Sequence, residues 1–424
     1  MVCDKDVCRA YEEILADELI PAMGCTEPIA IALAGAAARE TLGAVPQVLT
    51  LAVSSNILKN AKSAVVPNTG GQKGLRAALA AGAAAGRAER GLEVIAQVDD
   101  AGRAAMHRLL EQCAITVIPA QSEEVFDILV EARAGTDCAR VRFAGGHTNL
   151  VLKEKNGVVL YRMPVEKEQQ KRAACALLNV EAIYTYAIEM PLDPTWELIE
   201  RQIEYNTAIR DEGLTGRWGA GIGATILKTG ADVRTRARAA AAAGSDARMS
   251  GCELPVVINS GSGNQGLTAS LPVIEYAQAL GVSRETLHRA LLLSNLLTIH
   301  LKTGLGCLSA YCGAVSAGSA AGAAVAWLSG GDLSAVNHTL VNALAILSGM
   351  VCDGAKPSCA AKIACAVDAG LLGWEMVRDG RQFRGGDGIV TKGVENTIAN
   401  VCRIGRDGMR QTDREIIGIM LENE

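Results

Sequence analysis

The period of the hydrophobic pattern changes along the chain and predicts two kinds of structure. Residues 4–19 repeat with the 3.6-residue period of an amphipathic helix, and a second helix is expected to begin with Thr26 as its N-cap. From Val45 the period shortens to that of strands, and a hairpin with a strong turn signal at Asn156-Gly157 closes this region. The predicted strands cover residues 45–55, 92–98, 114–120, 126–134 and 138–145, with helices at 71–87 and 101–112.

Beyond residue 168 nearly every segment has the helical period. The predicted helices cover residues 180–190, 194–210, 218–245, 269–281, 284–300, 306–328, 332–350 and 359–379, and another helix pair closes the tail. The pattern predicts an α+β protein, mostly helical, with a smaller α/β domain near the N-terminus. We expect N-terminal helices at 1–45 that pack on the larger domain, the α/β domain at 46–168 and the helical domain at 169–424, with the charged run 166–172 as the candidate linker.

The stretch from Leu305 to Gly330 carries no charge and is long enough to span a bilayer. It consists mainly of Gly, Ala, Ser and Cys, so the free energy of its insertion into a bilayer would be only weakly favourable. Asn337 and His338 interrupt the next helix. We therefore expect a buried central helix and no membrane span.

Composition narrows the class of protein. The chain of 424 residues is 49% hydrophobic and 21% charged, as folded proteins are, and its net charge of −5 argues against a nucleic-acid partner. Its 45 glycines and 3% aromatic residues predict helices packed closely on small side chains. The charged N-terminal segment is unlike a signal peptide, and an odd number of cysteines, 13, favours free or metal-bound thiols in the cytoplasm.

Five cysteines gather in residues 302–365, which are rich in Gly, Ala and Ser. Small residues let the backbone approach a group that is not protein. A turn with a Gly and a Pro separates Cys352 from Cys359, so these thiols flank a loop. This suggests a soft-metal or iron–sulfur site, although the spacing matches neither a zinc ribbon nor a ferredoxin. The five residues are Cys307, Cys312, Cys352, Cys359 and Cys365.

Cys25 directly precedes the expected helix start at Thr26, where a helix dipole lowers the pKa of a thiol. Its position supports a reactive thiol and a buried structural cysteine equally. Glu27 is either a dipole partner or an acid–base group. Residues 260–264, SGSGN, follow an apolar run and would suit a carboxylate or phosphate bound by backbone amides and hydroxyls.

In combination, several motifs resemble those of the L-cysteine desulfidase family, which is related to the α domain of iron–sulfur L-serine dehydratases. The resemblance covers essentially the whole chain. The motifs are MGCTEPIAIALA (23–34), PNTGG (67–71), HTN (147–149), SGSGNQG (260–266), LKTGLGCLSAYCG (301–313), MVCDGAKPSC (350–359) and TIANVCRIGRDGM (397–409).

The resemblance implies a 4Fe–4S cluster held by Cys312, Cys352 and Cys359, with Cys307 as the alternative to Cys312. The fourth iron of such a cluster lacks a protein thiolate and acts as a Lewis acid. The domain at 169–424 would then be the iron–sulfur catalytic domain. Cys25 looks like the family's N-terminal functional cysteine, either the catalytic base or a resting-state ligand of the open iron.

This chemistry suits β-elimination from L-cysteine to hydrogen sulfide, pyruvate and ammonia, without pyridoxal phosphate. The substrate would be a small amino acid, and L-cysteine is a good match because iron binds thiolate well. Lys302 is a second catalytic candidate, and it shares with His147 and Asn264 the expected role of holding the carboxylate or orienting the amine. Lys302 could instead cap a helix, and His147 could be an ordinary loop histidine. The full set of expected substrate contacts is His147, Asn149, Ser260, Ser262, Asn264 and Asn68.

Three alternatives stay open. L-serine could be the substrate of the same machinery. A non-catalytic iron–sulfur sensor would need neither the polar loops nor Cys25, and a structural zinc site would leave function elsewhere. A homo-oligomeric state is also left open by the sequence.

Overall fold

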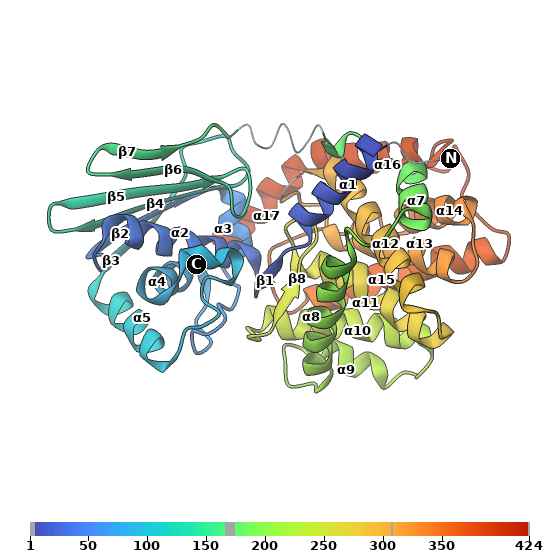
Figure 1. The fold of residues 1–424 in the computed structure, drawn as a ribbon, viewed down its shortest axis with the longest axis horizontal. Coiled ribbons are helices and arrows are strands. Elements are labelled where there is room, and N and C mark those ends of the chain that lie inside the picture. The colour runs from blue at the N-terminus through green and yellow to red at the C-terminus, as the bar shows by residue number, and fades with distance from the viewer. Residues whose placement is uncertain (1–4, 166–173, 307, 423–424) are drawn as a thin grey trace.

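The computed structural model describes residues 5–165, 174–306 and 308–422, and these divide into a sheet-containing part and a helical part (Figure 1). This is the predicted α+β class, with the smaller α/β part near the N-terminus. The candidate linker at 166–172 and Cys307 lie outside the described residues.

The sheet-containing part combines a mixed sheet with helices on one face. The first two elements of the chain, α1 (Lys5–Glu18) and β1 (Pro21–Met23), pack on the helical part. The elements that follow are α2 (Thr26–Leu42), β2 (Val48–Val53), α3 (Ser55–Ala61), α4 (Gly74–Ala85), η1 (Ala88–Glu93), α5 (Asp100–Gln112), β3 (Ala114–Pro119), β4 (Asp127–Ala134), β5 (Asp137–Ala144), β6 (Leu150–Lys155) and β7 (Val158–Arg162). In the described residues the sheet has six strands in the order β3-β2-β4-β5-β6-β7. Only β2 and β3 run parallel, and α2, α4 and α5 lie on one face of the sheet (Figure 1).

Most of the predicted strands are confirmed, but the strand expected at 92–98 is wrong. This segment forms a 3-10 turn and further turns, and its Leu92 and Ile95 side chains are buried. The carbonyl oxygens of Ile95 and Ala96 accept hydrogen bonds from the Asn68 Nδ2 at 2.9 and 3.3 Å. A side-chain amide therefore replaces the neighbouring strand that an apolar run would otherwise need.

The helical part surrounds one very apolar helix. Its elements are α7 (Val180–Glu189), α8 (Trp196–Leu214), α9 (Ile222–Leu227), α10 (Val233–Met249), β8 (Pro255–Val257), α11 (Gly263–Leu280), α12 (Arg284–Leu305), α13 (Gly313–Leu328), α14 (Leu333–Ile346), α15 (Cys359–Arg378), α16 (Val394–Arg403), the π-turn η2 (Ile404–Gly408) and α17 (Arg410–Glu422). Most of the predicted helices appear with shifted ends, but the single helix expected at 218–245 is wrong. The chain forms two helices there, α9 and α10, because Asp232 caps a new helix start by accepting a hydrogen bond from the Thr235 amide.

Two N-terminal elements cross to the helical part. Helix α1 packs there, because the Tyr11 hydroxyl donates to the Leu177 carbonyl at 3.0 Å and its ring meets Tyr186 edge-on at 5.3 Å. Strand β1 pairs antiparallel with β8. Helix α2, in contrast, packs on α4 and the sheet. Residues 1–45, grouped together from sequence, thus contact both parts of the molecule.

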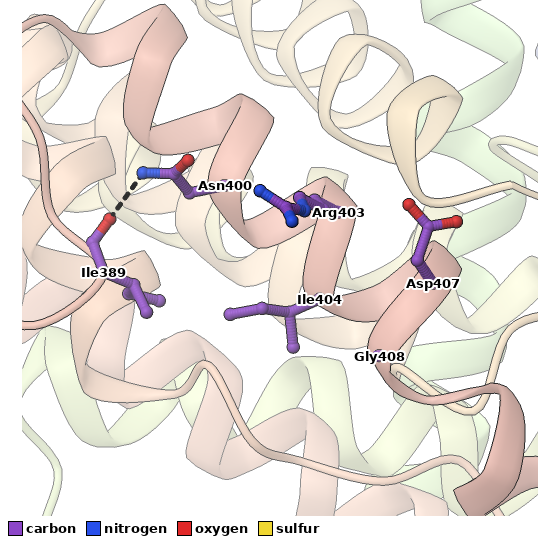
Figure 2. A pocket seen from close by; sticks show the side chains of 6 residues that line it. All are labelled: Ile389, Asn400, Arg403, Ile404, Asp407 and Gly408. Atoms are coloured by element: carbon purple, nitrogen blue, oxygen red, sulfur yellow. Dashed lines mark hydrogen bonds between the residues drawn. The ribbon is translucent and has the colours of Figure 1, made fainter.

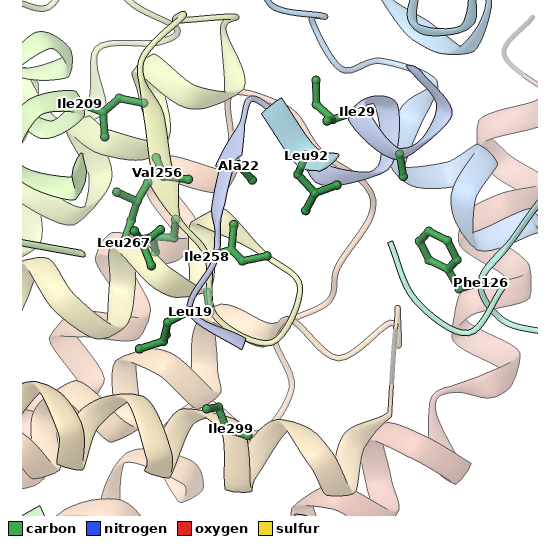
Figure 3. Close-up of a cluster of buried hydrophobic side chains, with 14 of the residues drawn as sticks. Leu19, Ala22, Ile29, Leu92, Phe126, Ile209, Val256, Ile258, Leu267 and Ile299 are labelled. Atoms are coloured by element: carbon green, nitrogen blue, oxygen red, sulfur yellow. The ribbon is translucent and has the colours of Figure 1, made fainter. Parts of the chain in front are cut away.

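The core is continuous between the two parts and relies on small residues. Leu19 and Ala22 from the N-terminal segment lie near Val256, Ile258 and other buried side chains of the helical part (Figure 3). Glycines allow helices to touch backbone to backbone: a Cβ added at Gly82 would overlap the α2 backbone. The predicted close packing of helices on small side chains is confirmed.

Residues 313–328 of the uncharged stretch form α13, and residues 314–326 of this helix are buried among α11, α12, α14 and α15. The expected buried central helix is confirmed. In the described ranges, no helix combines the length and the apolarity needed to cross a membrane.

Candidate active site

Four of the described helices begin close together where the two parts of the molecule meet. The start of α2 reaches the start of α11, because the Thr26 Oγ1 donates to the Gly261 carbonyl at 2.9 Å. A Cβ added at Gly313, the first residue of α13, would lie 2.7 Å from the Cδ of Gln265 in α11. Cys25 at the start of α2 and Cys359 at the start of α15 belong to one small hydrophobic cluster with Ala64 and Met249. Helix N-termini carry partial positive charge, so this junction favours anions and thiolates.

Cys312 and Cys352 lie on two segments that pair as a short antiparallel bridge. The amide of Cys312 donates to the Met350 carbonyl at 3.0 Å, and the amide of Cys352 donates to the Ala310 carbonyl at 2.6 Å. This register makes the two cysteines diagonal neighbours on one face of the ladder, where Cα atoms are about 7–8 Å apart. Cys359, in the first turn of α15, is near enough for its charge to raise the pKa of Cys312.

Close helix packing fixes the positions of Cys312 and Cys359. Cβ atoms added at Gly318 and Gly322 of α13 would collide with the backbone of α15 at Ala366 and Gly370, respectively. The contacts advance together along both helices, so α13 and α15 run parallel and begin at the same end. The small residues that were noted in the sequence bring the two helix starts, and with them the two thiols, to one place.

The turn between Cys352 and Cys359 is held by its own charges. The Lys356 and Lys362 ammonium groups both contact the Asp353 carboxylate. Gly354 has a φ of 90°, and a Cβ added there would lie 2.5 Å from the Lys59 carbonyl oxygen of α3. A side chain there would be strained and would push α3 away, so this glycine is required by the turn.

Cys25 is buried and hydrogen-bonded to a buried carboxylate. It is the N-cap residue of α2, one position earlier than expected, so Thr26 is the first helical residue. Its Sγ donates to the Glu27 Oε2 at 3.1 Å. Burial first, and then the Glu27 charge, raise the pKa of the Cys25 thiol well above its usual value, although Arg248 opposes the shift. The expected lowering of this pKa is therefore wrong, because desolvation outweighs the helix dipole.

Glu27 is the centre of a small polar group. Its Oε1 accepts a hydrogen bond from the Asn60 Nδ2 at 3.1 Å and lies 3.8 Å from the His147 Nε2. The Thr26 Oγ1 donates to the Oε2 at 3.1 Å. Burial alone would raise the pKa of Glu27, but His147 and the Cys25 hydrogen bond outweigh it and lower the pKa to about 2. Glu27 is thus a buried carboxylate beside a neutral thiol.

The loop at 259–262 is held in place by hydrogen bonds among buried side-chain amides. The Asn259 Nδ2 donates to the Asn295 Oδ1 at 2.9 Å, and Asn295 exchanges hydrogen bonds with Gln202 at 3.0 and 2.7 Å. The Ser260 Oγ donates to the Asn259 Oδ1 at 2.8 Å. Ser260 and Gly261 have φ values of 50° and 73°, so the loop is held in a left-handed turn that serine rarely adopts.

The structure brings some predicted substrate contacts together at this loop. The His147 ring lies against Gly261, since a Cβ there would be 2.9 Å from its Cε1, and also meets Phe126 edge-on. Ser262 is the N-cap residue of α11 and makes no side-chain cap hydrogen bond. The Asn264 Oδ1 accepts from the Arg248 Nη1 at 3.1 Å.

The other predicted residues have contacts of their own. Asn149 donates to the Ala144 carbonyl at 2.8 Å within the sheet, and Asn68 fastens the 92–98 segment. The Lys302 Nζ donates to the Gly306 carbonyl at 2.8 Å, as a helix-capping lysine does. Their proposed roles toward substrate stay predictions.

Sequence reasoning missed Asn60, Arg248 and the Gln202–Asn295–Asn259 chain. Asn60 and Arg248 lie in ordinary helical contexts, and only burial of their polar side chains distinguishes them. The polar residues Asn259 and Asn295 in otherwise apolar runs were a signal that could have been used, because a fully buried amide needs partners.

Cys312, Cys352 and Cys359 are soft thiol donors of the kind that holds an iron–sulfur cluster. Among the described residues, no three His, Cys, Asp or Glu side chains surround one point as the ligands of one metal ion would. A cubane binds each cysteine at a different iron, so its ligands lie farther apart. Burial first, and then the charges of Cys352 and Cys359, raise the pKa of Cys312 to about 12. Three adjacent thiolates thus need a positive partner, which an iron–sulfur core provides.

Two cavities lie outside the thiol group itself. One of about 400 Å³ adjoins the Cys352–Cys359 turn and is lined by Lys59, Asp353, Lys356 and the apolar face of α17. The other, of about 510 Å³, lies between Ile389 and the α16–η2 segment, where Asn400 donates to the Ile389 carbonyl at 3.0 Å (Figure 2).

The fold and the site define an α+β protein with a thiol-lined centre between its two parts. The sequence model of the serine dehydratase alpha chain matches residues 89–418. The chain therefore belongs to the serine dehydratase alpha chain family. This family points to a lyase-type enzyme of the iron–sulfur-dependent kind.

Curated relatives cover nearly the whole chain. A UPF0597 protein of Desulfitobacterium hafniense (strain Y51) is 54% identical over 415 residues, which span 97% of this chain and 96% of the relative. A UPF0597 protein of Lachnoclostridium phytofermentans is 47% identical, spanning 96% of this chain and 98% of the relative. One of Treponema denticola is 43% identical over the full length of both chains.

Proposed function

We propose that this protein is an iron–sulfur-dependent lyase that converts L-cysteine and water to hydrogen sulfide, pyruvate and ammonia. One observation carries the proposal: Cys25, which is hydrogen-bonded to the buried Glu27, belongs to a small buried cluster against which Cys359 also packs, and Cys359 is one of the three thiols that would hold the cluster of iron and sulfur. A structural metal site has no need of a thiol that shares a proton with a carboxylate. A site for α,β-elimination needs such a group beside the metal.

The cluster would be held by Cys312, Cys352 and Cys359 and would supply a Lewis-acidic iron that activates the sulfur leaving group. Cys25 acts as the base in its thiolate form: it takes the proton from the substrate Cα while the Cβ–S bond breaks, and Glu27 accepts the hydrogen bond of the thiol that results. Asn60 and His147 hold Glu27 in position for this transfer. The aminoacrylate that is released hydrolyses in water to pyruvate and ammonia.

L-serine is the second candidate substrate, and the family description favours it. The same residues would take the Cα proton, and water would leave in place of hydrogen sulfide. Burial of soft thiols around the site favours cysteine, because iron binds a sulfur leaving group more readily than a hydroxyl.

A turnover assay on anaerobically reconstituted protein tests the proposal. Pyruvate is measured with each amino acid, and sulfide with L-cysteine. We expect a kcat/KM for L-cysteine well above that for L-serine, with equal amounts of sulfide and pyruvate. The reverse preference would establish the dehydratase alternative, and no pyruvate from either amino acid would contradict both.

Replacing a single proposed ligand tests the cluster separately. Cys352→Ala should remove the broad visible absorption of the anaerobic protein, its iron and its turnover, because two thiolates hold a cubane poorly. Cys365→Ala is the matched control, since Cys365 is an exposed thiol on the same helix as Cys359. A brown Cys352→Ala protein would remove Cys352 from the ligand set.

A further inference from the structure

Arg248 is a buried cation in the candidate site, and the elimination chemistry described above gives it no task. It lies in the last turn of α10 and is 2% exposed. The next residue, Met249, packs against Cys25 in a small buried cluster that also includes Cys359. The guanidinium is thus close to both the proposed base and the proposed cluster.

Not every N–H donor of Arg248 has a hydrogen-bond acceptor among the described residues. Its Nη1 donates to the Asn264 Oδ1 at 3.1 Å, whereas its buried Nε has no hydrogen-bond partner among the described residues. Within the same residues, no carboxylate oxygen lies within 4.0 Å of the guanidinium to form an ion pair with it. A buried arginine without an anion is costly, so its retention here calls for a ligand.

The guanidinium packs against the start of α11, and a Cβ added at Gly263 would lie only 2.2 Å from its Nε. A Cβ added at Gly263 would lie 2.7 Å from the Arg248 Cζ and 2.7 Å from the Val256 Cγ2, so glycine is what lets the guanidinium reach this position. Helix α11 has 18 residues, and its N-cap residue Ser262 leaves the first-turn amides without a side-chain acceptor. The arginine and the helix N-terminus therefore offer donors to the same place.

We propose that Arg248 binds the α-carboxylate of the amino-acid substrate and that Asn264 positions its guanidinium for this contact. The proposal rests on the proposed function, since it assigns the substrate group that this part of the site recognises. A carboxylate matches the paired donors of a guanidinium edge. The nearby Glu27 carboxylate disfavours a doubly charged anion such as phosphate at this place.

This contact also explains how the substrate would be oriented. A carboxylate on Arg248 lies on the α10–α11 side of the site, next to Cys25, and the Cα is attached directly to it. The side chain of the amino acid can then extend toward the cysteines at the starts of α13 and α15. The site should accept α-amino acids with free carboxylates and reject the corresponding amides.

Calorimetric binding of L-alanine and L-alaninamide to the anaerobic, cluster-loaded protein tests this recognition without turnover. L-alanine has no leaving group, and the two probes differ only at the carboxylate. We expect the wild-type protein to bind L-alanine about 10- to 100-fold more tightly than L-alaninamide, the range for a charge-assisted hydrogen-bonded pair. Arg248→Gln should reduce this ratio toward one, and Arg248→Lys should recover part of it.

Arg236→Gln is the matched control, because Arg236 lies on the same helix, is 41% exposed and pairs with Glu275. It should keep the wild-type ratio. Iron content and visible absorption are measured for every variant. An unchanged ratio in Arg248→Gln, or a wild-type protein that does not distinguish or bind the two probes, would overturn the proposal.

Altered absorption with an unchanged ratio would likewise overturn it and assign Arg248 to charge balance of the thiols. The proposed function is tested independently by the turnover assay. A protein that binds L-alanine through Arg248 and yet releases no pyruvate from L-cysteine or L-serine would contradict only the elimination chemistry.

Discussion

At the scale of single residues, the site depends on a neutral thiol beside an ionised carboxylate. Cys25 and Glu27 are two residues apart at a helix start, and both are buried. Their pKa values are shifted in opposite directions, Cys25 upward and Glu27 to about 2. Pairs of groups whose environments separate their pKa values are typical of acid–base sites. The thiol keeps its proton at rest and donates a hydrogen bond to the carboxylate.

Cys25→Ala should lower kcat by about 10²- to 10⁴-fold, the usual contribution of a positioned base. Iron content and visible absorption should stay at wild-type values, because Cys25 is not among the three proposed ligands. Stopped assays of pyruvate and absorption spectra of the same samples provide the measurement. Cys113→Ala, a buried cysteine at the end of α5, should remain fully active. Full activity of Cys25→Ala would end its role as base.

At the scale of elements, parallel packing of α13 and α15 sets where the ligands stand. The helices touch through Gly318, Gly322 and Gly370, so their separation is smaller than side chains would allow. Both begin at proposed cysteine ligands, and a change in helix separation would move one thiol relative to the other. Packing far from the sulfur atoms thus controls the geometry of the site.

Gly322→Val should destabilise the protein by about 1–3 kcal/mol, as overpacking of a tight core does. The added side chain would overlap the Gly370 backbone, and the shifted helices should retain less iron. Urea denaturation and iron analysis measure the two effects. Gly418→Ala is the control, because nothing lies within 4 Å of a Cβ at Gly418. A variant with wild-type stability would show that the two helices can separate freely.

Helices α8 and α12 are joined by a charged group that predicts a pH effect. Glu200 Oε1 is 2.7 Å from the Arg284 Nε and 2.7 Å from the His288 Nε2. Hydrogen bonding to Arg284 is the largest cause that lowers the pKa of Glu200 to about 2. The ionised form is favoured in the folded state, so this stabilisation is complete above the ordinary pKa near 4.5 and is lost as pH falls toward 2.

Glu200→Gln should therefore flatten the fall in unfolding free energy between about pH 4.5 and pH 2. Denaturant titrations of the cluster-free chain at several pH values measure this slope. Glu285→Gln is the control, since this more exposed carboxylate pairs with Arg289 on the same helix. Identical slopes for the wild type and Glu200→Gln would contradict the assigned pKa shift.

At the scale of the whole molecule, the site is formed by the contact between its two parts. The sheet-containing part contributes Cys25, Glu27, Asn60 and His147, and the helical part contributes the proposed ligands. Helix α17 helps to join them, because Asp413 contacts the buried Lys59 of α3 and also accepts from the Asn56 Nδ2 at 2.8 Å. Separation of the parts would dismantle the site even if each part stayed folded.

Asp413→Ala should cost up to about 3–5 kcal/mol, because it leaves the fully buried Lys59 ammonium without its anion. Activity should fall with stability, since α3 also carries Asn60. Asp407→Ala is the control: its exposed pair with Arg406 should contribute less than about 1 kcal/mol. Thermal unfolding of both variants gives the comparison, and equal losses would show that α17 does not join the two parts.

Local periodicity and turn chemistry were enough to predict most helices, most strands, the thiol-bearing turn and the nature of α13. The local pattern failed at 92–98, where an apolar run satisfies its carbonyls with Asn68 instead of a strand. It also gave the wrong direction for the pKa of Cys25, since the helix start was visible but its burial was not.

Which polar groups meet became known only from the fold. Asn60 reaches Glu27 across 33 residues of sequence, and Asn259 reaches Asn295 across 36. Arg248 can occupy its position only because residue 263, on another helix, is a glycine. Hydrogen bonds and desolvation act through space at a few ångströms, so no local pattern records them. The chain specifies its elements by neighbours in sequence, whereas the chemistry of the candidate site follows from neighbours in space.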